Sequence, residues 1–537
     1  MKVPSPRELG LPFDEYFPDQ YEIAAEIASS QEPVVFYEGP TGVGKSLTAM
    51  TAVQLIRQDN PDARAVILCS SKALQLQYQE DFPGVAILWG RSNFRCALDE
   101  DFDCSEAPCS IEGMGCSESE KWEICPYYRH KRRAIHSPIV ITNMAYFLHE
   151  ANYVGHLGNL DFLVVDEGDL LERELLRFAG LELSARSLNQ AGIELPDLSS
   201  TLEARRWASR VLPRVLKKAL DAAKAARDDE SWLKKAIRLS GHVKRLKRLA
   251  NIEPEKWVIQ KTLTGYTLQP IWATEYGQDY VFRHARKVLV MSATMPPPDV
   301  YARQLGVQQG YRYLESDSPF PRENRPINYW PIAKLKGNAL GYPELRQISN
   351  AVDAILRMFP NQKGIVHTVS YRLRDAILDR SIYRRRFITH NWHGNGGLSR
   401  EQALEKFKAS TEPVVLISPS MSRGVDLPHD QCRFVIVVKV PFLSLGDPQV
   451  RARLKQDPEW YAAAAADELV QAFGRGVRAR DDYCVGFILD STFGWFARRN
   501  KRLFPDWWRK TVYPIKDLGE AILPPQMKGG VHAANSD

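Results

Sequence analysis

The chain has 537 residues, which is too long for a single hydrophobic core, so we expect about three or four domains. Its 44% hydrophobic and 25% charged residues are typical of an ordinary soluble globular protein, and no apolar run is long enough to cross a membrane. The N-terminus lacks the apolar core of a signal peptide, so we expect a cytoplasmic protein with no membrane partner. The formal net charge of +6 is modest, and its distribution along the chain matters more than its sum.

The stretch Gly39–Ser46 has the G-x-x-x-x-G-K-[ST] pattern of a P-loop. An apolar run before it, Val34–Tyr37, predicts a buried strand, and a helix is predicted after it. Glycines let such a loop turn tightly and direct backbone N–H groups at phosphate oxygens. We expect Lys45 to reach the β- and γ-phosphates of ATP and Ser46 to bind Mg²⁺. The expected nucleotide-binding residues of the loop are Gly39, Pro40, Thr41, Gly42, Val43, Gly44, Lys45 and Ser46.

About one helix before the P-loop, Gln20 is a candidate for reading the adenine base. In isolation, a glutamine on a helix surface is the commoner explanation for such a residue. The assignment of Gln20 to the nucleotide site therefore depends on the rest of the chain.

A second apolar run, Phe162–Val165, predicts a buried strand that ends at Asp166 and Glu167. In an open parallel sheet, ligands bind at the carboxyl ends of the strands. Because a P-loop lies upstream, this carboxylate pair predicts an ATP-hydrolysis site. Asp166 is expected to bind Mg²⁺, and Glu167 to orient and deprotonate the attacking water. Further strands of the same sheet are expected at Ala65–Cys69, Pro138–Asn143 and Lys287–Thr294.

The eight cysteines fall into two groups. Three lie in apolar, strand-like runs and are expected to be small buried core residues: Cys69, Cys432 and Cys484. The other five lie in one short stretch, which in a cytoplasmic chain favours a metal site over disulfides: Cys96, Cys104, Cys109, Cys116 and Cys125. Four thiolates can hold a 4Fe–4S cluster or Zn²⁺, and the lack of a C-x-x-C pair argues against a common zinc ribbon.

The region from residue 170 to about residue 257 is dominated by helix formers. Between Arg205 and Ala250 there are fifteen Lys or Arg residues against four Asp or Glu residues. This excess is larger than the net charge of the whole chain, so the rest of the chain is net acidic. Apolar residues recur at helical spacing in this region. The sequence therefore predicts a separate helical insertion with a basic face, and contact with nucleic acid is favoured over an ordinary solvated surface.

A second α/β region is predicted from Asn328, after the proline-rich linker Ser318–Pro326. Helical segments separate its expected strands, which predicts a second parallel sheet without its own P-loop. The expected strands are Gly364–Thr368, Val414–Ser418, Phe434–Val438 and Val485–Asp490. The aromatic and basic segment Trp495–Lys510 follows, for which base stacking and packing against the domain are both open.

Two motifs in this second region are candidates for contact with the nucleotide, Ser422–Asp426 and Gln471–Arg478. The second places Gln471, Arg475 and Arg478 at helical spacing on one face. Surface helices often look like this. An ATPase with its P-loop on another domain needs added positive charge, however, and the two arginines could stabilise phosphate charge in the transition state.

In this order, the motifs resemble the XPD/DinG family of iron–sulfur superfamily 2 DNA helicases over nearly the whole chain. The resembling segments are Gly39–Ser46 for motif I, Asp166–Asp169 for the DEAH box, Ser292–Thr294 for motif III, Ser422–Asp426 for motif V and Gln471–Arg478 for motif VI. The cysteines lie where that family has its iron–sulfur domain, and the basic helical segment lies where it has its arch domain. Three features depart from the family: Gly168 and Asp169 replace Ala and His of the box, Phe17 replaces a frequent Arg, and the arch is short.

The resemblance implies an α/β fold with two tandem RecA-like parallel-sheet motor domains and two insertions in the first. The implied limits are 1–90, 134–171 and 258–327 for motor domain 1, 91–133 for the iron–sulfur cluster domain, 172–257 for the helical arch, 328–515 for motor domain 2 and 516–537 for a partly disordered tail. It also implies ATP, Mg²⁺ and a 4Fe–4S cluster as cofactors. The implied catalytic residues are Lys45, Asp166, Glu167, Gln471, Arg475 and Arg478, with Gly424 and Asp426 added to the nucleotide site.

Four cysteines bind the cluster in that family, so one of the five here is spare. The expected ligands are Cys96, Cys109, Cys116 and Cys125, with Cys104 as an alternative to Cys109. Basic residues around the last ligand are expected to follow the phosphates of a strand at the single-strand/duplex junction: Arg129, Lys131, Arg132 and Arg133.

The expected activity is that of a monomeric, ATP-dependent DNA helicase that moves along single-stranded DNA. The resemblance implies 5′→3′ movement, which no residue shows by itself. The alternatives are a single-strand-dependent translocase that separates duplexes poorly, an enzyme acting on RNA–DNA hybrids in R-loops, and a binding subunit whose ATPase only switches its conformation.

Overall fold

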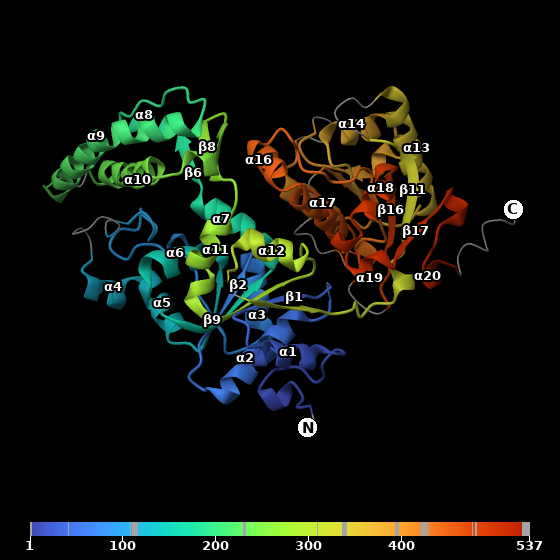
Figure 1. Cartoon of the computed structure of the whole chain (residues 1–537), viewed down its shortest axis with the longest axis horizontal. Coiled ribbons are helices and arrows are strands. Elements are labelled where there is room, and N and C mark those ends of the chain that lie inside the picture. Colours follow the sequence, from blue (N-terminus) through green and yellow to red (C-terminus); the bar gives the residue numbers. More distant parts are fainter. Residues whose placement is uncertain are drawn as a thin grey trace.

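The computed structural model describes residues 3–40, 42–107, 109, 116–228, 232–308, 310–335, 341–392, 397–419, 427, 429–474, 476–477 and 481–528. Figure 1 shows two sheet-containing lobes, with a helical hairpin projecting from the first. No helix in these described ranges combines the length and apolar character of a membrane span.

The first lobe contains a seven-stranded sheet in the order β10-β1-β9-β5-β2-β4-β3, in which all paired strands are parallel. Its central strands are apolar runs buried on both faces, as parallel sheets require. One face is covered by α1 (Gln20–Ser29), α2 (Lys45–Asp59) and α3 (Lys72–Asp81), and the other by α6 (Met144–His149), α7 (Leu171–Ala179), α11 (Thr274–Tyr280) and α12 (Pro298–Leu305). The strands are β1 (Val34–Glu38), β2 (Ala65–Cys69), β3 (Ala86–Ile87), β4 (Ile139–Asn143), β5 (Leu160–Asp166), β9 (Ala285–Ser292) and β10 (Tyr311–Glu315).

The second lobe contains another seven-stranded sheet, also parallel, in the order β13-β14-β12-β15-β16-β11-β17. Its strands are β11 (Ile327–Ala333), β12 (Gly364–His367), β13 (Phe387–Ile388), β14 (Val415–Ser418), β15 (Phe434–Val437), β16 (Val485–Asp490) and β17 (Val512–Pro514). Its helices include α13 (Tyr342–Met358), α14 (Tyr371–Arg380), α15 (Arg400–Ala409), α16 (Pro448–Gln456), α17 (Pro458–Phe473), α18 (Thr492–Arg499) and α19 (Asp506–Arg509). Two parallel α/β domains, as expected, are therefore confirmed.

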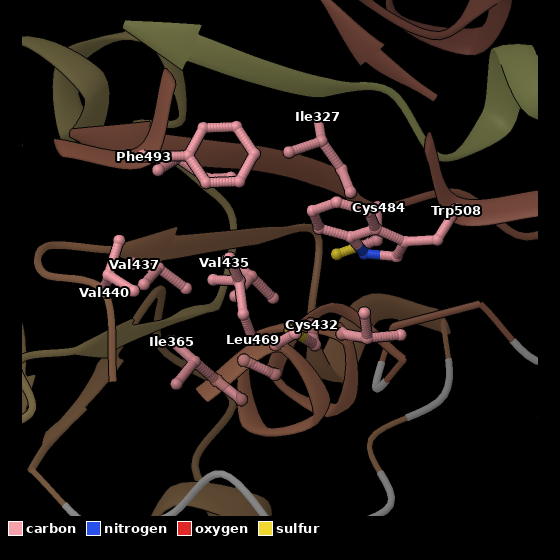
Figure 2. Packing of buried hydrophobic residues seen from close by; sticks show 14 of the residues in the cluster. Ile327, Ile365, Cys432, Val435, Val437, Val440, Leu469, Cys484, Phe493 and Trp508 are labelled. Atoms are coloured by element: carbon pink, nitrogen blue, oxygen red, sulfur yellow. The ribbon is translucent and has the colours of Figure 1, made fainter. Parts of the chain in front are cut away.

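Figure 2 shows part of the core between the second sheet and its helices. Cys432 and Cys484 lie there among aliphatic and aromatic side chains, and both are buried free thiols. Cys69 is likewise a buried free thiol in the core of the first lobe. The expectation that these three cysteines are core residues is confirmed.

Two insertions interrupt the first sheet. Between β3 and β4 lie the five clustered cysteines with α4 (Glu118–Ile124) and α5 (Pro126–Ile135). After α7 comes the antiparallel hairpin of α9 (Thr201–Asp228) and α10 (Leu233–Ala250). The sequence did not predict the small antiparallel sheet β6-β8-β7 that lies beside the hairpin: β6 (Leu181–Ser184), β7 (Trp257–Lys261) and β8 (Gly265–Pro270).

A buried ion pair joins the two lobes on the side of the hairpin. Arg453 of α16 is 3% exposed, and its Nη1 and Nη2 atoms lie 3.2 and 3.0 Å from the carboxylate oxygens of Glu172 in α7. Its guanidinium lies 4.6 and 4.8 Å from the ring centres of Trp272 and Trp460, and its Nε donates to the Ile271 carbonyl at 2.5 Å. The lobes are therefore joined by a fully surrounded cation, as well as by the linker between β10 and β11.

A second buried ion pair docks the cysteine insertion onto the first lobe. Lys131 of α5 and Glu150 are 1% and 2% exposed, and Lys131 Nζ lies 2.7 Å from both carboxylate oxygens. Tyr146 and the backbone N–H of His156 also donate to Glu150, at 3.3 and 3.1 Å. Burial lowers the pKa of Lys131 and Glu150 opposes that shift, so the charged amine depends on its partner.

Replacing Lys131 with Met should leave the Glu150 carboxylate buried without its counter-ion. Loss of one partner of a buried pair costs about 3–5 kcal/mol, so hydrogen–deuterium exchange in α5 should rise strongly and the melting temperature should fall. Arg132→Met changes an exposed neighbour and should shift stability by less than about 0.5 kcal/mol. Equal effects of the two substitutions would contradict this reading of the pair.

Candidate ATP site and cysteine cluster

The P-loop connects β1 to α2 at the carboxyl edge of the first sheet. Gly42 and Gly44 have φ angles of 85° and 74°, a left-handed backbone conformation that favours glycine. The Lys45 Nζ donates to the Gly39 carbonyl at 2.8 Å, so the amine lies over its own loop. A phosphate bound by the loop would take the place of that carbonyl as its partner.

Gln20 lies behind the loop with 2% of its surface exposed. Its Nε2 donates to the Gly44 carbonyl at 2.7 Å and to the Val43 carbonyl at 3.4 Å, and its Oε1 accepts from the Phe17 N–H at 3.0 Å. The Gln20 amide thus supports the P-loop through these hydrogen bonds. Its contact with the adenine base stays a prediction. The Phe17 ring is 41% exposed beside Gly44.

Asp166 ends β5 beside the P-loop and is 5% exposed. Its Oδ2 accepts from the Tyr78 hydroxyl at 2.8 Å, and its Oδ1 accepts from the Glu167 N–H at 2.8 Å. Burial raises the pKa of Asp166, and Lys45 is the first of the groups that oppose the shift. The sequence did not reveal Tyr78, which also forms a side-chain hydrogen bond with Ser46 and so lies between the two expected Mg²⁺ ligands.

Glu167 has a φ angle of 53°, an uncommon backbone conformation for a residue other than glycine. Strained backbone of this kind persists where the surrounding structure fixes it, often at functional sites. The Ser70 hydroxyl, just after β2, donates to its carboxylate. The side chain is thus held at the sheet edge beside Asp166, where a catalytic base is expected.

The two departures from the DEAH pattern have physical reasons. A Cβ at Gly168 would lie 2.4 Å from Val290 Cγ1 of the adjacent strand β9, so the site has no room for alanine. Asp169 accepts a hydrogen bond of 2.6 Å from Ser292, the first residue of the motif III segment. The box is therefore joined to that segment even though aspartate stands in the histidine position.

The end of the same segment touches the second lobe. Thr294 donates to Asp467 of α17 at 2.5 Å and accepts from the side-chain amide of Gln471, one helical turn further on. The hydrogen bonds between Asp169 and Ser292 and between Thr294 and α17 thus connect the segment that carries the two carboxylates to the second lobe. Five expected nucleotide-site or catalytic residues lie outside the described residues, and their roles stay predictions: Thr41, Gly424, Asp426, Arg475 and Arg478.

Glu38 is a further acid at this edge that the sequence did not single out. It ends β1, is 3% exposed, and accepts from the Tyr313 hydroxyl at 3.0 Å. Burial, followed by the nearby Glu315 and Asp467, raises the pKa of Glu38 to about 8. The carboxyl is therefore mostly neutral at neutral pH, directly before the P-loop.

All five clustered cysteines line one small pocket. Cys96, Cys104 and Cys125 are buried, and Cys109 and Cys116 are half-buried. The Cys104 and Cys125 sulfurs lie 3.7 Å apart, and Cys104 also contacts the Arg95 carbonyl at 3.3 Å. Within the described ranges, no three Cys, His, Asp or Glu side chains converge as one metal ion requires.

The expected phosphate-tracking residues do not all face outward. Lys131 is buried in its ion pair with Glu150, so its assignment to that surface is wrong. Its partner lies on another helix, which no local sequence pattern reveals. Arg129, Arg132 and Arg133 are exposed and share a shallow surface with Trp122 and His136. The charge run thus divides into one docking residue and three surface residues.

Comparison with known proteins agrees with this arrangement. The DEAD/DEAH box helicase family matches residues 17–205, and the helicase C-terminal domain family matches residues 345–511. The ATP-dependent DNA helicase YoaA of Escherichia coli is 22% identical over 88% of this chain and 90% of its own length. The Fanconi anemia group J protein homolog of Gallus gallus is 23% identical over 44% of this chain, but the match spans only 22% of that protein.

The fold points to the same group. A solved XPD helicase structure superposes with a TM-score of 0.62 at 15% identity, covering 93% of this chain and all of the other. The XPD helicase subunit of general transcription and DNA repair factor IIH from Schizosaccharomyces pombe is 25% identical over 43% of this chain and 33% of its own length. The chain belongs to the XPD/DinG-like family of helicases, and is thus an ATP-dependent helicase.

Glu38 gives the stability a pH dependence whose sign can be tested. Its folded pKa of about 8 lies above the ordinary 4.5, so the unfolded chain ionises first. This group therefore lowers the free energy of unfolding by about 1.4 kcal/mol per pH unit as pH rises through that window. The Glu38→Gln variant lacks this ionisable group. The melting temperature of the variant minus that of the wild type should therefore increase between pH 5 and about 8. For the exposed control Glu80→Gln, the difference should stay constant, and a constant difference for Glu38→Gln would contradict the assignment.

Proposed function

We propose that the chain is a DNA helicase that moves along single-stranded DNA and separates duplexes at the expense of ATP. The observation that supports this most directly is the pair of hydrogen-bonded contacts, Asp169 with Ser292 and Thr294 with α17, that connects the segment Asp166–Asp169 to the second lobe. A change at the nucleotide would alter the fit between two lobes, and alternate opening and closing of two lobes can advance a strand. The DNA-helicase names of its relatives support DNA as the partner.

Within this proposal, MgATP binds between the two motor domains. Lys45 and the P-loop amides hold the phosphates, Ser46 and Asp166 hold Mg²⁺, and Glu167 orients the attacking water. Gln471 already reaches the first domain through Thr294. Arg475 and Arg478 follow Gln471 in the sequence and would deliver positive charge to the phosphates when the lobes close.

The cysteine pocket suits a 4Fe–4S cluster better than a zinc ion. A four-iron cluster takes one thiolate at each iron, so its ligands need not meet at a point, whereas structural zinc binds four ligands around one ion. We assign Cys96, Cys109, Cys116 and Cys125, which all line this pocket, as the ligands. Cys104 lines the same pocket and contacts Cys125 and a backbone carbonyl, and we assign it as the fifth thiol beside the set. A bound cluster would fasten an insertion that has little core of its own.

We place the unwinding wedge at this insertion, with single-stranded DNA passing between it and the α9–α10 arch. The exposed Arg129, Arg132 and Arg133 would contact phosphates at the single-strand/duplex junction. Twelve further Lys and Arg residues of the hairpin have exposed side chains: Arg205, Arg206, Arg210, Arg214, Lys217, Lys224, Lys235, Arg238, Lys244, Arg245, Lys247 and Arg248. Such contacts are poorly sequence-specific and weaken with salt. We assign 5′→3′ movement, a monomeric motor and the predicted domain limits to the same proposal.

Strand separation on tailed substrates tests the proposal. Lys45→Ala and Glu167→Gln should each lower DNA-stimulated ATP hydrolysis by about 10²-fold or more, because each removes a group that acts on the transition state. The exposed Lys408→Ala, on the outer helix α15, should keep wild-type activity. The wild type should unwind a forked duplex with a 5′ tail. ATP hydrolysis that is stimulated by single-stranded DNA without unwinding would favour the translocase alternative. Preference for an RNA–DNA hybrid would favour an enzyme that acts on R-loops. Unwinding from a 3′ tail alone would contradict the assigned 5′→3′ direction.

Iron and acid-labile sulfide content of anaerobically purified variants tests the cluster and its ligands. Cys104→Ser should keep the wild-type iron, sulfide and visible absorbance, because this thiol lies beside the ligand set. Cys109→Ser should lose most of all three. The reverse result would make Cys104 the ligand, and one zinc ion per chain without labile sulfide would exclude the cluster.

A further inference from the structure

A buried hydroxyl, that of Tyr78, lies inside the first lobe beside the ATP site. Tyr78 belongs to α3, which follows β2, and β2 lies next to β5 in the sheet. The side chain is 1% exposed, and its ring lies 5.9 Å from that of Phe82 in the apolar core. Burying a hydroxyl costs free energy unless it is hydrogen-bonded. Its hydrogen-bond partners, Asp166 and Ser46, both belong to the ATP site.

The direction of these two hydrogen bonds follows from the single proton of a phenol. Tyr78 donates that proton to Asp166 Oδ2 at 2.8 Å. In its hydrogen bond with Ser46, the Tyr78 oxygen must therefore accept and the serine hydroxyl must donate. A directed chain of hydrogen bonds thus runs from Ser46 on α2, through Tyr78 on α3, to Asp166 on β5.

This direction suits the expected role of Ser46 and Asp166 as Mg²⁺ ligands. Mg²⁺ takes oxygen ligands and demands near-ideal octahedral geometry. A hydroxyl binds the ion through an oxygen lone pair, so its proton has to be accepted by another group, and Tyr78 accepts the proton of Ser46. Asp166 accepts from Tyr78 at Oδ2 and from the Glu167 N–H at Oδ1, which fixes the orientation of the carboxylate.

We infer that Tyr78 is a positioning residue for the magnesium ion of the nucleotide, because its hydroxyl orients Ser46 and Asp166 together. The inference rests on the proposed function, in which these two residues hold Mg²⁺. The P-loop and the carboxylate pair supply the two ligands from separate elements, and Tyr78 joins them from a third element. The tyrosine therefore determines how tightly the metal is held, while the P-loop alone holds the phosphates.

The test uses the full-length protein and the fluorescent nucleotide mant-ADP, titrated with MgCl₂ or in EDTA. Tyr78→Phe keeps the ring and its contact with Phe82 and removes only the hydroxyl. The Mg²⁺ concentration that gives half of the metal-dependent gain in affinity should rise about 10–100-fold, as is typical when a group that orients metal ligands is removed. Affinity for mant-ADP in EDTA should stay within about twofold of the wild type, which also shows that the variant is folded.

Binding of the metal itself is measured with Mn²⁺, which oxygen ligands also bind, by the EPR signal of the free ion. In the presence of ADP, Tyr78→Phe should bind Mn²⁺ about 10–100-fold more weakly than the wild type. Tyr266→Phe is the matched control, because Tyr266 is 4% exposed and its hydroxyl donates to Asp197 in the helical insertion. This control should bind Mn²⁺ and mant-ADP like the wild type.

The magnesium dependence of DNA-stimulated ATP hydrolysis separates positioning of the metal from a direct part in the reaction. For Tyr78→Phe the apparent KM for Mg²⁺ should rise about 10–100-fold, and excess Mg²⁺ should restore kcat to within about threefold of the wild type. Asp166→Ala lacks a ligand and should stay inactive at every magnesium concentration. A rate of Tyr78→Phe that stays low in excess Mg²⁺ would overturn the inference.

The binding measurements can also overturn it. Affinities of Tyr78→Phe for Mg²⁺ and Mn²⁺ equal to those of the wild type would limit the hydroxyl to the stability of the core. Equal weakening of mant-ADP binding with and without metal would assign Tyr78 to the phosphates instead of the metal. A wild type whose mant-ADP binding does not respond to Mg²⁺ would reject the MgATP site of the proposed function itself, and this inference with it.

Discussion

Burial of two acids at one sheet edge is the constraint on which the first lobe depends. Asp166 and Glu38 end β5 and β1, the two strands that flank β9, at 5% and 3% exposure, and Glu167 and Asp169 follow Asp166 in the chain. Burial raises the pKa of both buried acids, and Lys45 is the first group that opposes the shift for Asp166. Such a site favours the arrival of positive charge, which Mg²⁺ and arginines of the other domain would supply. Under the proposed function, the electrostatics of this edge would favour closure of the two lobes around a nucleotide.

Two attachment points then determine what closure can do. Near the nucleotide, Thr294 bonds to Asp467 and Gln471 across the gap, and these polar contacts can be exchanged at small cost. At the side of the hairpin, Arg453 is enclosed by Glu172 and two tryptophans, and separating that pair would expose an unpaired charge. Under the proposed function, relative motion of the lobes would therefore pivot most easily about Arg453 and would open or close the contacts at Thr294.

The sequence predicted the features that depend on local pattern. Central strands such as β5 and β16 are long apolar runs, and the P-loop and paired carboxylates are defined by spacing alone. The edge strands β3, β10, β13 and β17 were not predicted, because they are short or mixed in polarity. Tyr78 was missed and Lys131 was misassigned for another reason: their partners, Asp166 and Glu150, come from other elements, and only the tertiary fold brings them together.

The segment Asp166–Asp169 departs from the family pattern at two positions, but it still forms a hydrogen bond with the next strand segment through Asp169 and Ser292. The close approach of Val290 leaves room only for glycine at position 168, and the Tyr301 hydroxyl donates to the Gly168 carbonyl. Asp169 then lies where it can accept from Ser292, so an acceptor on the box meets a donor on the next strand. The contact needs a hydrogen-bond acceptor of the right reach, and a carboxylate satisfies that need as an imidazole nitrogen does. Because Ser292 and Thr294 belong to one short segment, the hydrogen-bonded connection from the box to the second lobe does not require histidine.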